Sequence, residues 1–88
     1  MTEKKTIIKN STGLHARPAS QFVSCARNFL SKVYIKRDSG DAINAKSIVM
    51  LLSGAFAMGE AVTIGADGED EAEAVNTLVA LVDSGFGE

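Results

Sequence analysis

One histidine stands where it could carry out chemistry, between a glycine-containing loop and the start of a helix. The segment Gly13–Pro18 contains His15, the sole histidine of the 88 residues, and Arg17 two positions later. Pro18 suits the first turn of a helix, where a backbone N–H has no intrahelical partner. Because a helix N-terminus carries free N–H groups and partial positive charge, the amides of Ala16 and Arg17 can hold an anion beside the imidazole.

Arg17 strengthens this anion-binding interpretation. Its planar guanidinium offers several donors that match the oxygens of a phosphate group. Positive surroundings also disfavour the imidazolium form of His15, and the neutral imidazole is the form that can attack phosphorus. The local residues leave an alternative open, in which His15 is a surface residue at a helix start and Arg17 is simply exposed.

The rest of the composition narrows the function classes. Cys25 reads as a small apolar filler, because no second cysteine or histidine is present to activate it or to share a metal, so we expect no metal site and no cofactor. A net charge of -2 gives no general attraction to nucleic acid, and the longest apolar run, Ile48–Leu52, is too short to cross a bilayer. Since Met1–Lys5 is not followed by the apolar stretch of a signal peptide, we expect a cytoplasmic protein with soluble protein partners.

Short elements must position the histidine loop. A β-branched strand, Thr6–Ile8, leads into the turn residues Asn10–Gly13, and a helix from about Pro18 to Leu30 follows. The apolar residues at helical spacing in this helix are Ala19, Phe22, Val23, Ala26 and Leu30. The later elements are a strand over Lys32–Lys36, a short strand over Ala42–Asn44, a short helix from Ile48, a strand over Ala61–Ile64, and a last helix with an apolar stripe of Ala72, Val75, Val79 and Val82.

This order of elements predicts an α+β fold with one antiparallel sheet and helices on one face. The acidic residues Glu69, Asp70, Glu71 and Glu73 fall at the start of the last helix, where negative charge favours the helix dipole. Because a chain of this length can bury a single core, we expect residues 1–88 to form one domain.

Three segments of the chain match the motifs of a known family: Gly13–Ala19, Ala45–Ile48 and Gly68–Glu71. In these motifs, and in length and turn placement along essentially the whole chain, the sequence resembles HPr, the histidine-containing phosphocarrier of the phosphoenolpyruvate-dependent phosphotransferase system (PTS). The resemblance implies an open-faced β-sandwich whose four-stranded antiparallel sheet has the order 1-4-2-3, with three helices on one face.

The same resemblance implies a function. Enzyme I would transfer a phosphoryl group to Nδ1 of His15, forming a pros-phosphohistidine, and an enzyme IIA protein would take it away in sugar uptake. Arg17 would stabilise and position the phosphoryl group. The chain would then be a carrier rather than a stand-alone enzyme, and we expect it to act as a monomer.

Ser47 is a second candidate site, just before the short helix. Serine is a preferred N-cap, and capping alone explains its presence. The resemblance maps Ser47 onto a serine that a dedicated kinase/phosphorylase modifies in many bacteria, and it adds a transcription regulator to the set of partners. A phosphate there would place negative charge beside the surface that meets an acidic partner.

The short helix should also expose apolar residues, because five consecutive positions go once around a helix. An apolar patch rimmed by Arg17, Arg27 and Lys46 would suit transient docking, although extra core packing is an alternative. The expected docking residues are Ser20, Arg27, Lys46, Ile48, Val49 and Leu52. This run departs from common HPr sequences at Val49, at Met50 and over Ser53–Ala55, which leaves the identity of the partner open.

Other functional interpretations remain beside sugar transport. The ending Ser84–Phe86 resembles the nitrogen-related regulatory branch of the family, whereas Gly68–Glu71 favours the sugar branch. A non-carrier regulatory module that binds a transcription regulator is a further alternative, but such relatives lack the histidine present here. A nucleic-acid-binding domain fits least, given the acidic balance and the absence of a basic face with interleaved aromatic residues.

Overall fold

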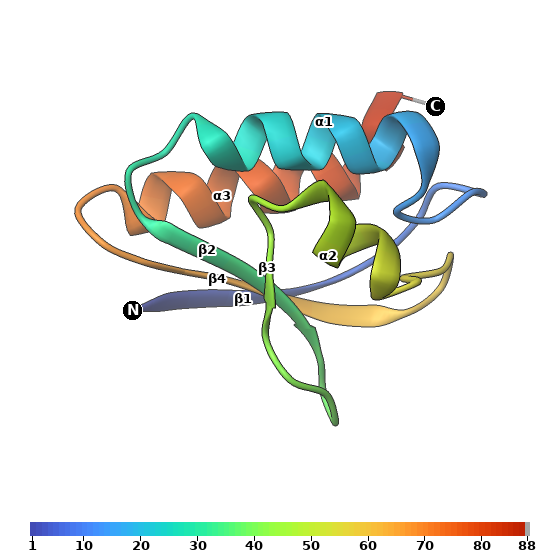
Figure 1. The fold of residues 1–88 in the computed structure, drawn as a ribbon, viewed down its shortest axis with the longest axis horizontal. Helices are drawn as coiled ribbons and strands as arrows, with labels where there is room; N and C mark the ends of the chain where they lie inside the picture. The colour runs from blue at the N-terminus through green and yellow to red at the C-terminus, as the bar shows by residue number, and fades with distance from the viewer. Residues whose placement is uncertain (88) are drawn as a thin grey trace.

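A computed structural model describes residues 1–87 as a four-stranded antiparallel sheet with helices on one face (Figure 1). The strands are β1 (Thr2–Ile7), β2 (Lys32–Arg37), β3 (Ile43–Asn44) and β4 (Ala61–Asp67), paired in the order β1-β4-β2-β3. The helices are α1 (Ala16–Arg27), α2 (Ile48–Ser53) and α3 (Glu71–Asp83), followed by a 3-10 turn, η1 (Gly85–Gly87). The expected α+β fold, strand order and three helices are confirmed.

Strand β4 lies at the centre of the sheet and is buried on both faces. It pairs with β1 along six residues and with β2 along six residues, and Val62–Ala66 are all buried. On the face away from the helices, the Tyr34 ring covers Gly65 so closely that a Cβ there would lie 2.2 Å from ring atoms. The pairing continues to Ala66 with β1 and to Asp67 with β2, so β4 runs past Ile64, where the sequence pattern had placed its end.

The core fills the space between the helices and the sheet. Its largest fully buried side chains are Phe22, Ile8, Leu14, Ile35, Leu51, Ile64 and Leu78. They come from all three helices, from strands β2 and β4 and from the loop that precedes α1. None of the helices in the described part of the chain is long and apolar enough to cross a membrane.

Helix α1 begins and ends earlier than the apolar spacing predicted. The chain leaves the helix after Arg27, where the Asn28 N–H donates to carbonyls of the last turn. Leu30 then lies outside the helix with 81% of its surface exposed, so its assignment to the helix was wrong. The cause is a distant carboxylate, because the N–H groups of Leu30 and Ser31 both donate to Asp70, at 2.8 and 2.9 Å.

Strand β1 starts at Thr2 rather than at Thr6 and includes three charged residues. Charged side chains are well tolerated there because β1 is an edge strand of the sheet. In α3, Ala72 is exposed, and the buried stripe consists of Ala74, Val75, Leu78 and Val82. Phe86 in η1 is also buried, with a φ of 59°, and the sequence pattern had not placed it in the core.

Asp70 and Glu71, at the start of α3, accept hydrogen bonds from three separate parts of the chain. Asp70 accepts hydrogen bonds from the turn after α1, as described above. Glu71 accepts from the hydroxyl of Thr2 at 2.5 Å, from the amino group of Met1 at 2.9 Å and from the Gly68 N–H at 3.3 Å. The Thr2 hydrogen bond first, and then the Met1 amino group, lower the pKa of Glu71 to about 2. These carboxylates therefore do more than complement the helix dipole.

This arrangement predicts a pH dependence of stability. Because the pKa of Glu71 is depressed in the folded state, its stabilising effect is present above its ordinary pKa of 4.5 and is lost as pH falls toward about 2. Glu71→Gln should therefore unfold at a lower urea concentration than the wild type at pH 7, and the gap should close by about pH 2.

The control is Glu73→Gln, since Glu73 is an exposed residue in the same turn. Urea unfolding of the three proteins between pH 7 and pH 2 measures the effect. A gap between Glu71→Gln and the wild type that stays constant over this range would contradict the assignment.

Candidate functional site

His15 occupies the N-cap position of α1. Its backbone is extended, with φ -142° and ψ 154°, and its side chain makes no capping hydrogen bond. The N–H groups of Ala16 and Arg17 are therefore in the first turn, where a helix has no carbonyl to offer them, and Pro18 contributes no donor. Because His15, Ala16 and Arg17 are all exposed, an incoming anion can reach these donors and the imidazole together.

The backbone turns sharply immediately after His15. Ala16 has a φ of 52°, in the left-handed region, which costs a residue with a Cβ about 1–2 kcal/mol. Such a conformation persists only where neighbouring contacts fix it, and clusters at functional sites. The residues directly before Ala16 are held by hydrogen bonds of the loop before α1, so the position of His15 depends on that loop.

The loop over residues 8–15 is tied together by its own hydrogen bonds. Buried Asn10 donates from Nδ2 to the carbonyl of Gly13 at 2.7 Å, and the same carbonyl accepts from the His15 N–H at 3.0 Å. Leu14, only 1% exposed, inserts its side chain into the core. Sequence reasoning had treated Asn10 as a turn residue, and it gave Leu14 no role.

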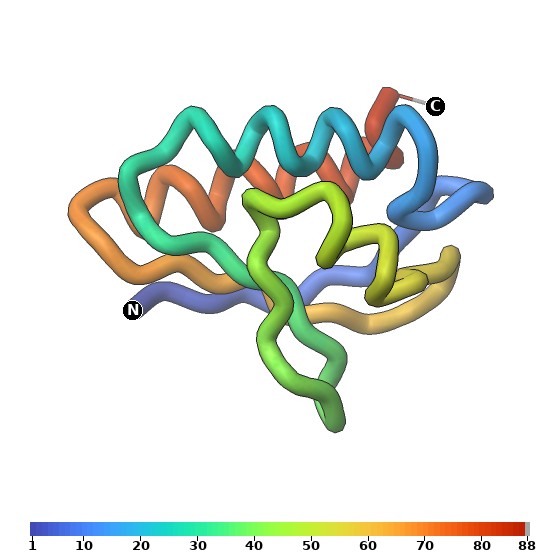
Figure 2. Tube along the Cα trace, in the orientation of Figure 1, coloured from blue at the N-terminus to red at the C-terminus, as the bar shows by residue number. Residues whose placement is uncertain are grey.

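A second loop, residues 54–60 between α2 and β4, supports the first. The Leu14 N–H donates to the carbonyl of Phe56 at 3.0 Å, the Gly59 N–H donates to Ile8 at 2.7 Å, and the Ile8 N–H donates to Glu60 at 3.0 Å. Figure 2 shows both loops at the end of the molecule where α1 begins. We call these three main-chain hydrogen bonds the seam. The sequence did not predict the seam, because loops far apart in the chain leave no local pattern that pairs them.

Ser47 is the N-cap of α2, as predicted. Its hydroxyl accepts from the Met50 N–H at 3.3 Å. Two of the three basic residues expected to rim the patch also connect the end of α1 to the segment before α2. Arg27 donates from Nε to the Lys46 carbonyl at 2.9 Å, and Lys46 donates from Nζ to the Phe29 carbonyl at 2.7 Å. Arg27 and Lys46 therefore have a structural task whatever else they bind.

Helix α2 exposes apolar side chains, as the run Ile48–Leu52 had predicted. Val49 is 68% exposed, Met50 47% and Leu52 38%, whereas Leu51 is buried in the core. A hollow of about 210 Å³ lies between α1 and α2 and is lined by Ser20, Val23, Ser24, Arg27 and Ile48. Five of the six expected docking residues therefore lie on α1 or α2, and Lys46 lies two residues before α2.

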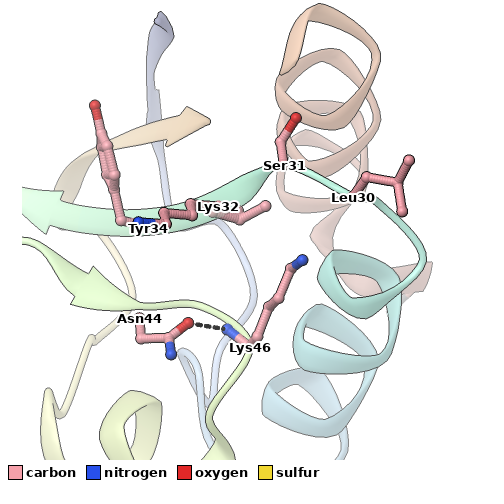
Figure 3. Close-up of a pocket in the computed structure, with 7 residues that line it drawn as sticks. Leu30, Ser31, Lys32, Tyr34, Asn44 and Lys46 are labelled. Atoms are coloured by element: carbon pink, nitrogen blue, oxygen red, sulfur yellow. Dashed lines mark hydrogen bonds between the residues drawn. The ribbon is translucent and has the colours of Figure 1, made fainter. Parts of the chain in front are cut away.

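A larger hollow of about 420 Å³ lies at the opposite end of α1 from His15 (Figure 3). Exposed Leu30 forms one side, and Tyr34, Asn44 and Lys46 lie on the sheet side. Its lining contains none of the residues around His15. Among residues 1–87, no three His, Cys, Asp or Glu side chains come together in a way that could hold a metal ion.

Comparison with known proteins identifies the family. The family model described as "PTS HPr component phosphorylation site" matches residues 2–84, which include the His15 loop and all three helices. The chain belongs to the HPr family. HPr proteins are phosphocarriers of the PTS, and the match confirms the resemblance seen in the sequence motifs.

Individual HPr relatives agree over nearly the full length. The chain is 43% identical over 83 residues to the HPr-like protein Crh of Halalkalibacterium halodurans, covering 94% of this chain and 98% of that protein. It is 41% identical over 88 residues to the phosphocarrier protein HPr of Cupriavidus necator, covering 100% and 98%. The crystal structure of HPr-C-His from Thermoanaerobacter tengcongensis superposes with a TM-score of 0.95 at 45% identity, covering 100% and 98%.

The family also contains other forms. Some relatives are phosphocarrier proteins named NPr, and solved structures include dimers of HPr from Thermoanaerobacter tengcongensis and of Crh from Bacillus subtilis. These relatives share the fold of the present chain but differ from one another in name and in assembly.

The close contact between the two loops predicts that an added methyl group destabilises the protein more at Gly13 than at Gly59. Gly13 has a φ of 68°, and a Cβ there would lie 2.4 Å from the Phe56 carbonyl oxygen. Gly59 has a φ of 88° but open space around its Cβ position, so it is a matched control for backbone strain alone. We expect Gly59→Ala to cost about 1 kcal/mol and Gly13→Ala about 3 kcal/mol of unfolding free energy, measured by urea denaturation. Equal losses would show that the loops are not in tight contact at Gly13.

Proposed function

We propose that residues 1–88 form one cytoplasmic phosphocarrier domain, which accepts a phosphoryl group from enzyme I on His15 and donates it to an enzyme IIA protein in sugar uptake. The observation that carries this proposal is the exposed N-cap position of His15, beside the free amides of Ala16 and Arg17. Membership of the HPr family supports the same assignment.

The chemistry is an in-line exchange between two imidazoles. A lone pair on Nδ1 of neutral His15 attacks the phosphorus of the phosphohistidine on enzyme I, a new N–P bond forms, and the donor N–P bond breaks as its electrons return to the donor imidazole. The second transfer repeats the exchange toward enzyme IIA. The Ala16 and Arg17 amides and the Arg17 guanidinium hold the phosphoryl oxygens during both steps.

The exposure of the site suits a carrier. A protein that bound its phosphorylated form very tightly would slow the onward transfer, because stabilising a ground state raises the barrier out of it. Arg17 is exposed, and it makes no ion pair with another residue in the described part of the chain. It is thus available to the phosphoryl group without binding it in a closed pocket.

We assign partner docking to the face formed by α1 and α2. Ser20, Arg27 and Ile48 line one hollow there, Val49 and Leu52 expose apolar surface, and Lys46 adds positive charge at the start of α2. An apolar patch with a basic rim suits transient contact with acidic partners, enzyme I and enzyme IIA, in a 1:1 complex with a monomer of this chain.

The nitrogen-related branch of the family is a second candidate function. The ending Ser84–Phe86 favours it, and the burial of Phe86 gives this ending a place in the fold. The carrier chemistry at His15 is the same in both branches, so only the partner that removes the phosphoryl group differs. Assaying transfer to enzyme IIA proteins of both branches distinguishes them. A non-carrier regulatory module, which would bind a transcription regulator without accepting a phosphoryl group, is the outcome left if neither transfer occurs.

His15→Ala tests the proposed acceptor. With enzyme I and phosphoenolpyruvate, the wild type should gain one acid-labile, base-stable phosphoryl group, and the variant should gain none, because no other imidazole is present. Intact-protein mass spectrometry before and after acid treatment measures this. A label that persists in the variant would show that His15 is not the acceptor.

Ser47→Asp tests the proposed regulatory site. Because aspartate and serine are both good N-caps, the fold should be retained, whereas the added charge beside the basic rim should weaken association with enzyme I by about tenfold, or ~1.4 kcal/mol. Raising the salt concentration should narrow the difference.

Ser47→Asn is the matched control, since asparagine caps a helix as well as aspartate but adds no charge. Affinity for enzyme I is measured for the three proteins at low and high ionic strength, alongside thermal melts. If Ser47→Asp binds as tightly as Ser47→Asn, then Ser47 acts as a helix cap alone.

A further inference from the structure

Arg37, at the end of β2, makes the most connected side-chain network described in this chain, and nothing in the chemistry above uses it. Its Nε and Nη2 donate to the two carboxylate oxygens of Glu60, at 2.5 and 3.0 Å, as a bidentate pair. Nη2 also donates to the carbonyls of Gly54 at 2.6 Å and Ala55 at 3.1 Å. The guanidinium carbon lies 4.3 Å from the centre of the Phe56 ring.

Glu60 extends this network along the same loop. Its Oε1 accepts from the Ala57 N–H at 2.7 Å, so the pair together contacts residues 54 to 57. The hydrogen bonds from Arg37, and then from the Ala57 amide, lower the pKa of the Glu60 carboxyl from its ordinary value, so Glu60 is charged at neutral pH. We call Arg37 and Glu60 the clamp.

Arg37 contacts the 54–60 loop, to which Glu60 belongs, and this is the same loop that supports the segment before His15. Phe56 uses its carbonyl to accept the Leu14 N–H, one residue before His15, and Glu60 uses its carbonyl to accept the Ile8 N–H. Ala55, in the same loop, has a left-handed φ of 51°, which a residue with a Cβ adopts only where surrounding contacts fix it. The Arg37 bond to the Ala55 carbonyl is such a contact.

We propose that Arg37 and Glu60 are positioning residues for phosphoryl transfer, acting through the Phe56 carbonyl to hold Leu14 and thereby the His15 and Ala16 backbone. This inference rests on the proposed function of His15. Neither residue touches the phosphoryl group. The clamp fixes the 54–60 loop against the sheet, and that loop fixes the direction in which the first turn of α1 presents its free amides.

Arginine suits this task better than lysine. Four acceptors converge on the guanidinium, one at Nε and three at Nη2, so two of the acceptors share one N–H of Nη2. A planar fork with donors in fixed directions suits this arrangement. A lysine ammonium keeps the charge but not the fork, so Arg37→Lys should retain the fold and still loosen the loop. The Gly54 and Ala55 carbonyls lie at the C-terminal end of α2, so the same guanidinium also favours the dipole of that helix.

Hydrogen exchange of single amides, combined with transfer rates, tests the proposal. The Leu14 N–H reports the seam directly, and the Ile64 N–H at the centre of β4 reports global opening. In Arg37→Gln and in Glu60→Gln, we expect exchange at Leu14 to rise about tenfold relative to Ile64, and the single-turnover rate from phosphorylated enzyme I, at saturating concentration, to fall three- to tenfold. Arg37→Lys should lie between these variants and the wild type.

Two further proteins sharpen the test. Lys36→Gln removes a neighbouring charge of β2 that pairs with Glu3 at 3.5 Å instead of with the loop, and it should leave both readouts at wild-type values. The double variant of Arg37→Gln with Glu60→Gln should resemble either single variant, because the two residues act as one unit.

Any of three results would overturn the proposal: exchange at Leu14 that stays at the wild-type rate, exchange at Leu14 that rises by the same factor as at Ile64, or a selective rise at Leu14 while transfer keeps its wild-type rate. If the wild type itself accepts no phosphoryl group from enzyme I, the proposed function fails and the transfer role of the clamp fails with it. The exchange data would still decide, independently, whether the clamp holds the loop.

Discussion

Main-chain hydrogen bonds between two loops hold the residues around His15 in place, and the rest of the exposed site depends on them. The Leu14 N–H meets the Phe56 carbonyl, while Ile8 exchanges hydrogen bonds with Gly59 and Glu60. Backbone groups buried without such partners would cost about 1–3 kcal/mol each, so the seam is strongly preferred once the core has formed. Because the seam is made by backbone atoms, its geometry leaves the side chain of His15 free.

A carrier needs both parts of this arrangement. In the function that we propose, the imidazole of His15 and the Arg17 guanidinium must be open to two different partners, and both residues are exposed. The backbone that carries them must nevertheless be fixed, because a misdirected helix N-terminus would lose the contacts that we propose with the phosphoryl oxygens. Different parts of the site meet these two requirements. The hydrogen bonds lie in the two loops that support His15, whereas the side chains of His15 and Arg17 are exposed.

Local sequence patterns predicted the parts of the fold that local physics controls. The Ser47 cap, the exposed apolar run of α2 and the helix start near Pro18 follow from residue preferences at neighbouring positions. The strand order came from the family resemblance, since strand alternation does not specify which strands are neighbours. Leu30 was misplaced because its helical spacing is real, but a carboxylate 40 residues away ends the helix earlier. The pairing of Arg37 with Glu60, across 23 residues, left no periodic signal at all.

The face that we propose for docking contains residues with two different kinds of constraint. Arg27 and Lys46 connect the end of α1 to the segment before α2 through backbone carbonyls, so their side chains contribute to the fold even without a partner. Val49 and Met50 are largely exposed, and nothing in the packing of the core requires their apolar character. Exposed apolar surface beside a charged rim is typical of binding sites for other proteins. Val49 and Met50 therefore give the clearer support to the docking that we propose, whereas Arg27 and Lys46 have the connection between α1 and the segment before α2 as a sufficient reason for their positions.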